Sequence, residues 1–179
     1  TELRLEGANL TGPLDPEIGT LTMLTSLRLH DNAFTGNLPT EIGNLVNLQD
    51  LRLEVNEFSG MIPSEVGRLV NLADLRVETN SFNQTIPSEI GLLNSLVRFE
   101  MQHNLISGQI PSQIANLATL EILYCFDNFL SGALPNNVGQ LQALRELQCH
   151  MNRFDNVGRP GLSGNLPRSL GELPNLQIL

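Results

Sequence analysis

Arginines recur at a fixed spacing in the first half of this sequence, and arginine is well suited to hold a polar partner. Its planar guanidinium group carries five N–H donors that match carboxylate and phosphate oxygens two at a time. Acidic or polar residues stand two positions before and after each arginine, so we expect a lattice of alternating charges. Two interpretations stay open, a self-neutralising solvated surface or a hydrogen-bonding surface for a polar or acidic partner. A phosphate cradle is not favoured, because the neighbouring carboxylates already occupy the arginine donors. The spaced arginines are Arg4, Arg28, Arg52 and Arg76.

An apolar triplet interrupts this polar pattern further along the chain. Ile122, Tyr124 and Phe126 stand where other segments have charged or polar residues, and Tyr124 is the only Tyr in the chain. Leu105 and Phe129 are also apolar, at a position where other segments use Ala, Glu, Ser or Arg. Apolar patches with a polar rim mark interaction sites, and tyrosine is enriched among residues that dominate binding. We predict one contiguous partner-binding patch, with packing inside a sheet or against another part of a longer chain as the alternative.

Polar residues complete the predicted binding surface. Some are expected to orient polar groups of a partner, and others form the rim of the apolar patch. They are Arg76, Arg98, Glu100, Gln148 and His150. A stretch rich in Gly and Pro, residues 154–161, is inserted beside the patch, and its Arg159 is expected to close one edge. Such insertions lie in loops, either at a binding face or as neutral protrusions.

An internal repeat of 24 residues sets the spacing of all these side chains. Leu24 begins one repeat, and the leucines at 48, 72, 96, 120 and 144 begin the next five. We number the positions of each repeat from this leucine, which is position 1. Position 9 is then an asparagine in each of these six repeats. The repeats span 1–23, 24–47, 48–71, 72–95, 96–119, 120–143, 144–175 with the insertion, and a partial 176–179. They predict a single domain over 1–179, and apolar residues at both ends suggest a piece of a longer chain without its caps.

The columns of the repeat predict its local structure. L-x-x-L-x-L alternates apolar and polar residues, so we expect one half-buried strand per repeat, with parallel stacking and outward side chains at positions 3, 5 and 7. The asparagine at position 9 can donate to and accept from neighbouring turns as a ladder. Glycine at position 13 permits a tight turn, although Gln84 replaces it once. A Ser or Thr before an acidic or amide residue, as in Thr40-Glu41, is expected to cap a short helical turn on the outer side.

The unit L-x-x-L-x-L-x-x-N-x-L-x-G-x-I-P-x-x-I-G-x-L resembles the plant-type subclass of the leucine-rich-repeat family over essentially the whole chain. The resemblance implies an α/β repeat solenoid, a right-handed superhelix with a parallel sheet on the concave face and short 3-10 helical turns on the convex face. It also implies an extracellular or cell-surface location.

Three functions follow from this resemblance as alternatives. The first is a non-catalytic module, similar to the extracellular part of receptor-like kinases or receptor-like proteins, that binds a peptide or protein on its concave face. The second is a secreted protein that resembles polygalacturonase inhibitors. The third is a structural accessory subunit of a larger assembly, in which the apolar patch is permanently buried.

Several other classes of function are not favoured by the sequence. The net charge is -9 and all ten basic residues are arginines, which argues against a nucleic-acid partner. No apolar run approaches the ~18 residues that a membrane-spanning helix needs. The three histidines are too far apart in a stack to share a metal, and no catalytic or phosphate-binding pattern appears, so no enzyme activity, metal or cofactor is expected. Cys125 and Cys149 face inward on adjacent strands and are expected to be free thiols.

Two N-x-T sequons, at Asn9 and Asn83, are candidate glycosylation sites if the chain is secreted. We expect both to lie at exposed turns.

Overall fold

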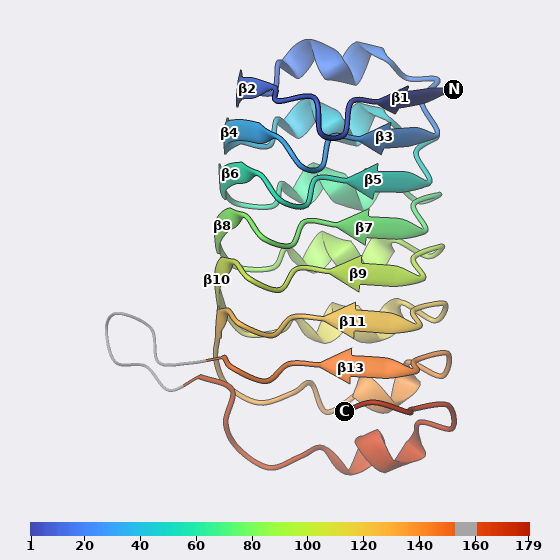
Figure 1. Ribbon diagram of the computed structural model, residues 1–179. Coiled ribbons are helices and arrows are strands. Elements are labelled where there is room, and N and C mark those ends of the chain that lie inside the picture. The colour runs from blue at the N-terminus through green and yellow to red at the C-terminus, as the bar shows by residue number, and fades with distance from the viewer. Residues whose placement is uncertain (153–160) are drawn as a thin grey trace.

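Each repeat places one short strand in a parallel sheet on the concave face, as the apolar–polar alternation predicts. The computed structural model describes residues 1–152 and 161–179. Within these residues the concave sheet has seven strands in chain order, which lie side by side in Figure 1. Leu27 pairs with Leu51 and Leu51 with Leu75, so each column of the repeat becomes a column in space. The strands are β1 (Glu2–Arg4), β3 (Ser26–Arg28), β5 (Asp50–Arg52), β7 (Asp74–Arg76), β9 (Arg98–Glu100), β11 (Ile122–Tyr124) and β13 (Glu146–Gln148).

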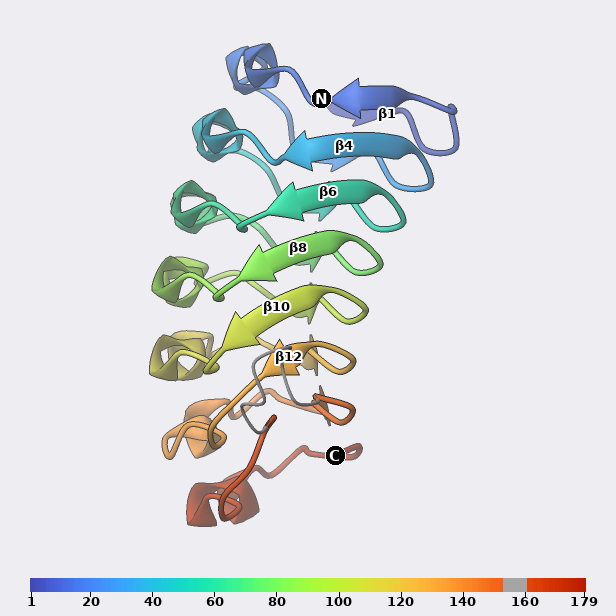
Figure 2. The same cartoon turned by 90° about the vertical axis from the view of Figure 1, so that its left-hand side faces the viewer.

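A second parallel sheet lies beside the first, so the prediction of one strand per repeat was wrong. It has six strands within the described residues and runs along the side of the solenoid that Figure 2 shows. Because the repeats stack in register, the segment after each asparagine lies beside the equivalent segment of the next repeat. The backbone groups of the two segments then form hydrogen bonds. For example, Ala33 N donates to Leu10 O at 2.8 Å. The strands are β2 (Thr11–Pro13), β4 (Ala33–Asn37), β6 (Glu57–Gly60), β8 (Ser81–Gln84), β10 (Leu105–Gly108) and β12 (Phe129–Leu130).

Short 3-10 helical turns cover the convex side, behind the concave sheet in Figure 1. The capping prediction was wrong, because proline holds the N-cap position. Pro39 precedes η2, and the hydroxyl of Thr40 donates to Glu41 Oε2 at 3.2 Å instead of capping the turn. Two turns have another residue at the N-cap: Asp15 before η1 accepts from Glu17 N at 2.9 Å, and Asn137 before η6 makes no side-chain capping bond. The turns are η1 (Pro16–Thr20), η2 (Thr40–Asn44), η3 (Ser64–Arg68), η4 (Ser88–Leu92), η5 (Ser112–Asn116), η6 (Val138–Gln140) and η7 (Arg168–Glu172).

The asparagine ladder is confirmed and links the two sheets. Asn104, which is 5% exposed, accepts from Phe82 N at 2.9 Å and donates to three carbonyl oxygens of its own and the preceding repeat. The same pattern recurs at the equivalent asparagines, such as Asn56 and Asn80. Each amide therefore satisfies backbone groups that the turn between the two sheets would otherwise leave buried and unpaired.

The glycine at position 20 of the repeat sets how closely the convex turns stack. A Cβ on Gly67 would lie 2.6 Å from the carbonyl oxygen of Glu89 in the next repeat. Ala115 holds the same position in repeat 96–119, and the turn that follows it, η6, has three residues where η2 to η5 each have five. The close approach of neighbouring turns therefore depends on the missing side chain.

Gln84 stands where other repeats have glycine, and it adopts the glycine conformation. Its φ is +66°, in the left-handed region where the glycines at 36, 60, 108 and 132 also lie. A residue other than glycine is destabilised by about 1 kcal/mol in this conformation. Gln84 adopts it because its repeat stacks in register on the neighbouring repeats.

Candidate partner-binding surface

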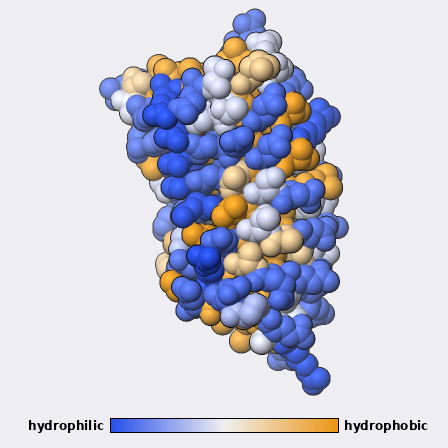
Figure 3. All heavy atoms as spheres, turned by 90° about the vertical axis from the view of Figure 1, so that its right-hand side faces the viewer, coloured by the Kyte–Doolittle hydropathy of each residue, from blue (hydrophilic) through white to orange (hydrophobic). Residues whose placement is uncertain are grey.

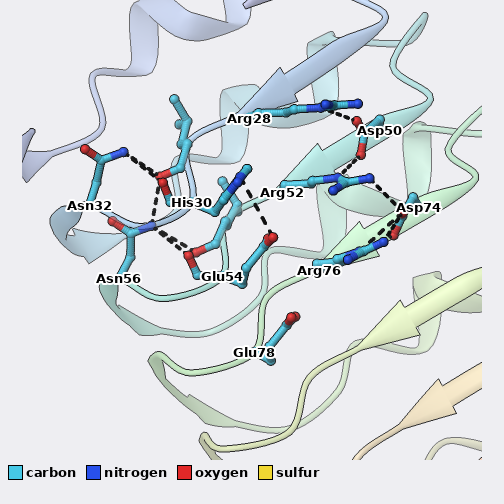
Figure 4. Close-up of polar contacts among 12 residues, drawn as sticks. Arg28, His30, Asn32, Asp50, Arg52, Glu54, Asn56, Asp74, Arg76 and Glu78 are labelled. Carbon is cyan, nitrogen blue, oxygen red and sulfur yellow. Dashed lines mark hydrogen bonds and ion pairs between the residues drawn. The ribbon is translucent and has the colours of Figure 1, made fainter. Parts of the chain in front are cut away.

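Arginines and aspartates form the predicted charge lattice on the concave face. Asp50 lies between two arginines, with Arg28 Nε at 2.8 Å from Oδ2 and Arg52 Nε at 2.9 Å from Oδ1. Arg52 also lies 3.5 Å from Asp74, which pairs with Arg76 at 2.9 Å. Figure 4 shows the three arginines turned toward these two aspartates. The lattice prediction is confirmed, including the occupation of arginine donors by carboxylates.

The pKa of Asp50 reflects this shared position. Burial alone would raise its pKa, but the hydrogen bonds from Arg52 and Arg28 outweigh burial and hold the pKa below its usual value. The hydrogen bond from Arg76 to Asp74 likewise raises the arginine's pKa. Both ions therefore stay charged at neutral pH.

The acidic side chains at position 7 are less well paired. Glu54 Oε1 lies 3.8 Å from His30 Nδ1, whereas no ion pair of Glu78 is found within the described residues. Figure 4 shows Glu78 below the arginine ladder, with no marked contact to the other residues drawn. Burial raises the pKa of both carboxyl groups, and for Glu78 the nearby charges of Glu100 and Glu54 help to raise it to about 7. Glu54 and Glu78 are not among the site residues predicted from the sequence. The only signal for them in the sequence is an acidic residue at position 7 in two consecutive repeats.

The raised pKa of Glu78 predicts a pH-dependent stability. The unfolded chain titrates this carboxyl near 4.5, so stability present at lower pH is lost as the pH rises through about 7. We expect Glu78→Gln to raise the free energy of unfolding at pH 8 by about 1 to 2 kcal/mol and to leave it nearly unchanged at pH 4. Urea unfolding at both pH values measures this. The exposed Glu57→Gln is the matched control, and an equal gain in the two variants would contradict the assignment.

The apolar triplet lies on the concave face, and its side chains are half-buried. The Tyr124 hydroxyl donates to Glu146, and this hydrogen bond raises the pKa of Tyr124 to about 12. The Phe126 ring stacks on His150 with centroids 4.6 Å apart and meets the edge of His103 at 5.1 Å. The two aromatic rings therefore lie on the concave side of the sheet and contact neighbouring side chains.

Leu105 and Phe129 lie apart from the triplet, at the starts of β10 and β12 in the second sheet. With Met151 they line a hollow of about 490 Å³ whose polar wall includes His103 and Asp127, which pair at 2.7 Å. The prediction of one contiguous exposed apolar patch is therefore corrected to two adjacent parts. His103 belongs to both, because it contacts Phe126 on one side and lines the hollow on the other.

The other predicted site residues differ in how available they are. Glu100 is 7% exposed and holds Arg98 at 2.7 Å and Gln102 Nε2 at 3.2 Å, so its expected role in orienting a partner directly is corrected. Gln148 is half-buried beside Tyr124, and His150 is exposed. Arg159 lies outside the described residues.

The two sequons lie in different surroundings. Asn9 is exposed, with φ of +56°. Asn83 is half-buried within β8, so the expectation of an exposed turn is wrong there, because the second sheet runs through this segment.

Figure 3 shows the side of the solenoid that is opposite to the second sheet. Hydrophilic side chains form a band on the side where the concave sheet lies, and apolar side chains are scattered among polar ones over the turns. The exposed apolar side chains of the described residues include Met23, Val46, Val70 and Leu92. Singly scattered apolar residues of this kind are normal on protein surfaces.

Within residues 1–152 and 161–179, no group of three or more His, Cys, Asp or Glu is placed to hold a metal ion. The same residues contain no helix that is both long and apolar enough to cross a bilayer. Cys125 is buried, Cys149 is half-buried, and both are free thiols.

Stacked 24-residue turns with an in-register concave sheet and an asparagine ladder define a leucine-rich-repeat solenoid. Residues 40–179 match the family model described as leucine-rich repeat region, and residues 23–45 match the leucine rich repeat model. The chain belongs to the leucine-rich-repeat family. No curated protein sequence matches it.

Solved structures similar to the chain include ectodomains of plant receptors. The leucine-rich-repeat ectodomain of the receptor kinase GASSHO1/SCHENGEN3 from Arabidopsis thaliana, in complex with CASPARIAN STRIP INTEGRITY FACTOR 2, is 37% identical over 96% of this chain, with a TM-score of 0.90. The Arabidopsis receptor kinase HAESA, in complex with the peptide hormone IDA and the co-receptor SERK1, is 30% identical over 98% of the chain, with a TM-score of 0.87. The plant peptide hormone receptor RGFR1, in complex with RGF2, is 30% identical over 97% of the chain, with a TM-score of 0.84. The chain spans 20%, 29% and 30% of these three chains, respectively.

Proposed function

We propose that this chain is a non-catalytic recognition segment that binds a peptide or protein partner on its concave face, as part of an extracellular receptor. The observation that carries the proposal is the aromatic cluster of Tyr124, Phe126 and His150 on a concave face whose other outward residues, apart from Ile122, are polar. Rings fixed by their neighbours lose little conformational freedom on binding, so this loss offsets less of the free energy gained by burying them. The three receptor ectodomains described above, each solved in a complex, support this reading.

Tyr124 and Phe126 supply the main apolar contacts of the proposed interface. A peptide that covers them buries aromatic surface, while the rim of Arg98, Gln148 and His150 offers hydrogen bonds. Tyr124 contributes to binding mainly through its ring, because its hydroxyl already donates to Glu146. The same hydrogen bond raises the pKa of Tyr124, so the phenol stays neutral. Arg76 is held by Asp74 and therefore contributes charge to the surface without reaching toward the partner.

The test is peptide capture by the 179-residue chain. A random peptide library displayed on phage is selected on the immobilised chain, and the enriched peptides are measured against Tyr124→Ala/Phe126→Ala. We expect at least a tenfold loss of affinity with little change in thermal stability, because both side chains lie on the surface. Leu92→Ala/Val97→Ala removes exposed apolar side chains elsewhere and is expected to keep the affinity. Equal affinity of the Tyr124/Phe126 variant, or no enriched peptide, would overturn the proposal.

A further inference from the structure

The arginine ladder neutralises only one side of the concave sheet. Arg52 and Arg76 direct their donors to the aspartates at position 3, Asp50 and Asp74. The glutamates at position 7 of the same two repeats, Glu54 and Glu78, receive no arginine hydrogen bond within the described residues. From 26 to 102, the outward positions hold four arginines and five carboxylates. The unbalanced negative charge therefore lies at position 7.

Three buried oxygen atoms at position 7 lack a hydrogen-bond donor within the described residues. They are Glu54 Oε2, Glu78 Oε2 and Gln102 Oε1; His30 Nδ1, 3.8 Å from Glu54 Oε1, is unpaired as well. Gln102 is only 8% exposed, and its Nε2 donates to Glu100, so its oxygen is turned away from that carboxylate. Buried acceptors are normally paired, because an acceptor without a donor destabilises the folded chain. Such a row of acceptors points to a donor-rich group that is supplied from outside the chain.

The three residues are consecutive along the solenoid. Thr79 N donates to Gln102 O at 3.0 Å and Val55 N to Glu78 O at 3.1 Å, so the strands that carry them are immediate neighbours. Adjacent strands lie about 4.8 Å apart, and the column spans about 10 Å. A planar group with donors on several edges can reach two of the acceptors at once.

We propose that Glu54, Glu78 and Gln102 form a subsite for the guanidinium group of an arginine in the bound peptide or protein. This inference rests on the proposed function, since it names a chemical feature of the same partner. Guanidinium is planar, always charged and more weakly hydrated than ammonium, and it offers five donors. Calcium fits less well, because it takes six to eight oxygen ligands.

The subsite lies on the same column as the aromatic cluster. Position 7 continues from Gln102 to Phe126 and His150 in the next two repeats. Glu78 is thus two strands, or about 10 Å, from Phe126. An extended peptide that crosses the strands advances about 3.3 Å per residue, so the arginine should stand about three residues from the side chain that covers Phe126.

A change in the pKa of Glu78 can report the binding of a guanidinium group. Its neighbours are Glu54, Glu100, Arg76 and Gln102, and burial beside the two acids keeps its pKa near 7. A bound guanidinium favours the ionised carboxylate, so the pKa of Glu78 should fall by at least one unit and a proton is released.

The experiment uses N-acetyl-arginine amide as the probe on the intact 179-residue chain. NMR follows the side-chain carboxyl resonances of glutamate and the backbone amides after β7 as the probe is added. We expect saturable shifts at Glu54 and Glu78, the fall in pKa, and at least tenfold weaker binding to Glu54→Gln/Glu78→Gln. The control Glu57→Gln is expected to bind as the wild type does. Both substitutions conserve side-chain volume on the sheet surface, so folding is retained.

Two comparison probes make the result decisive. N-acetyl-lysine amide and calcium chloride are titrated in the same way. Shifts that do not saturate, or equal binding by lysine amide or calcium, would overturn the guanidinium subsite. Peptide capture that persists without arginine binding overturns the subsite and leaves the proposed function standing. Arginine binding without capture of any peptide overturns the proposed function alone.

Discussion

Asn104→Ala is expected to lower the free energy of unfolding by about 3 to 4 kcal/mol. The substitution removes an acceptor for Phe82 N and a donor for the carbonyl oxygens of Val77, Met101 and Gln102. These backbone groups surround a side chain that is 5% exposed, so water reaches them poorly. The loss therefore includes the cost of leaving buried polar groups unpaired, which exceeds the net value of the bonds themselves.

Urea unfolding followed by circular dichroism measures the effect of Asn104→Ala. The matched control is Asn116→Ala, an exposed asparagine in η5, for which we expect a change within about 0.5 kcal/mol. A loss below 1 kcal/mol at Asn104 would show that the ladder is not a principal source of stability.

Gly67→Ala is expected to lower the free energy of unfolding by about 3 kcal/mol. The added Cβ would stand 2.6 Å from Glu89 O and 2.7 Å from Glu89 Cβ, so adjacent convex turns must separate. Separation strains the strands on the opposite face, because consecutive repeats pair on both sides of the core. Overpacking against backbone relaxes less readily than overpacking against a flexible side chain.

Gly171→Ala makes the same chemical change at the equivalent position in η7. There an added Cβ meets nothing within 4 Å, and we expect little change or a small gain from the lower entropy of the unfolded chain. Thermal and urea unfolding of both variants isolate the steric cost. Similar behaviour of the two variants would contradict the close-packing account.

The sequence predicts most of this architecture, because each column has a single structural role. The leucine alternation at positions 1, 4 and 6 predicts the concave sheet, and the spacing of asparagines predicts the ladder. The arginine lattice also follows from the sequence, since Arg52 and Asp50 must share a face when two residues apart on a strand. These features depend on periodicity alone, and the periodicity is unusually regular.

Other features depend on packing that no local pattern expresses. The second sheet consists of segments such as Ser81–Gln84, which lack an apolar alternation and become strands only because the stack aligns them. The hydroxyl of Thr40 is displaced from the capping role by Pro39, whose fixed φ already suits the start of the turn.

The sequence predicts on which face the residues of the candidate site lie, but it does not predict how far their side chains are buried. Ile122, Tyr124 and Phe126 lie on the expected face, while the contacts of Phe126 with His150 and of Tyr124 with Glu146 cover part of two of them. The unpaired acceptors of Glu54 and Glu78 result from the direction in which Arg52 and Arg76 turn. The spacing of residues in the sequence does not predict which rotamer Arg52 and Arg76 adopt.

The in-register pairing of equivalent residues allows a whole repeat to be duplicated while each residue keeps the same kind of neighbour. Duplication of the complete unit between Glu78 and Phe126 would move these two residues apart by about 4.8 Å and would keep Gln102 beside Glu78 and His103 beside Phe126. Such duplications would lengthen the distance between the proposed guanidinium subsite and the proposed aromatic contact in fixed increments, without altering any residue of either.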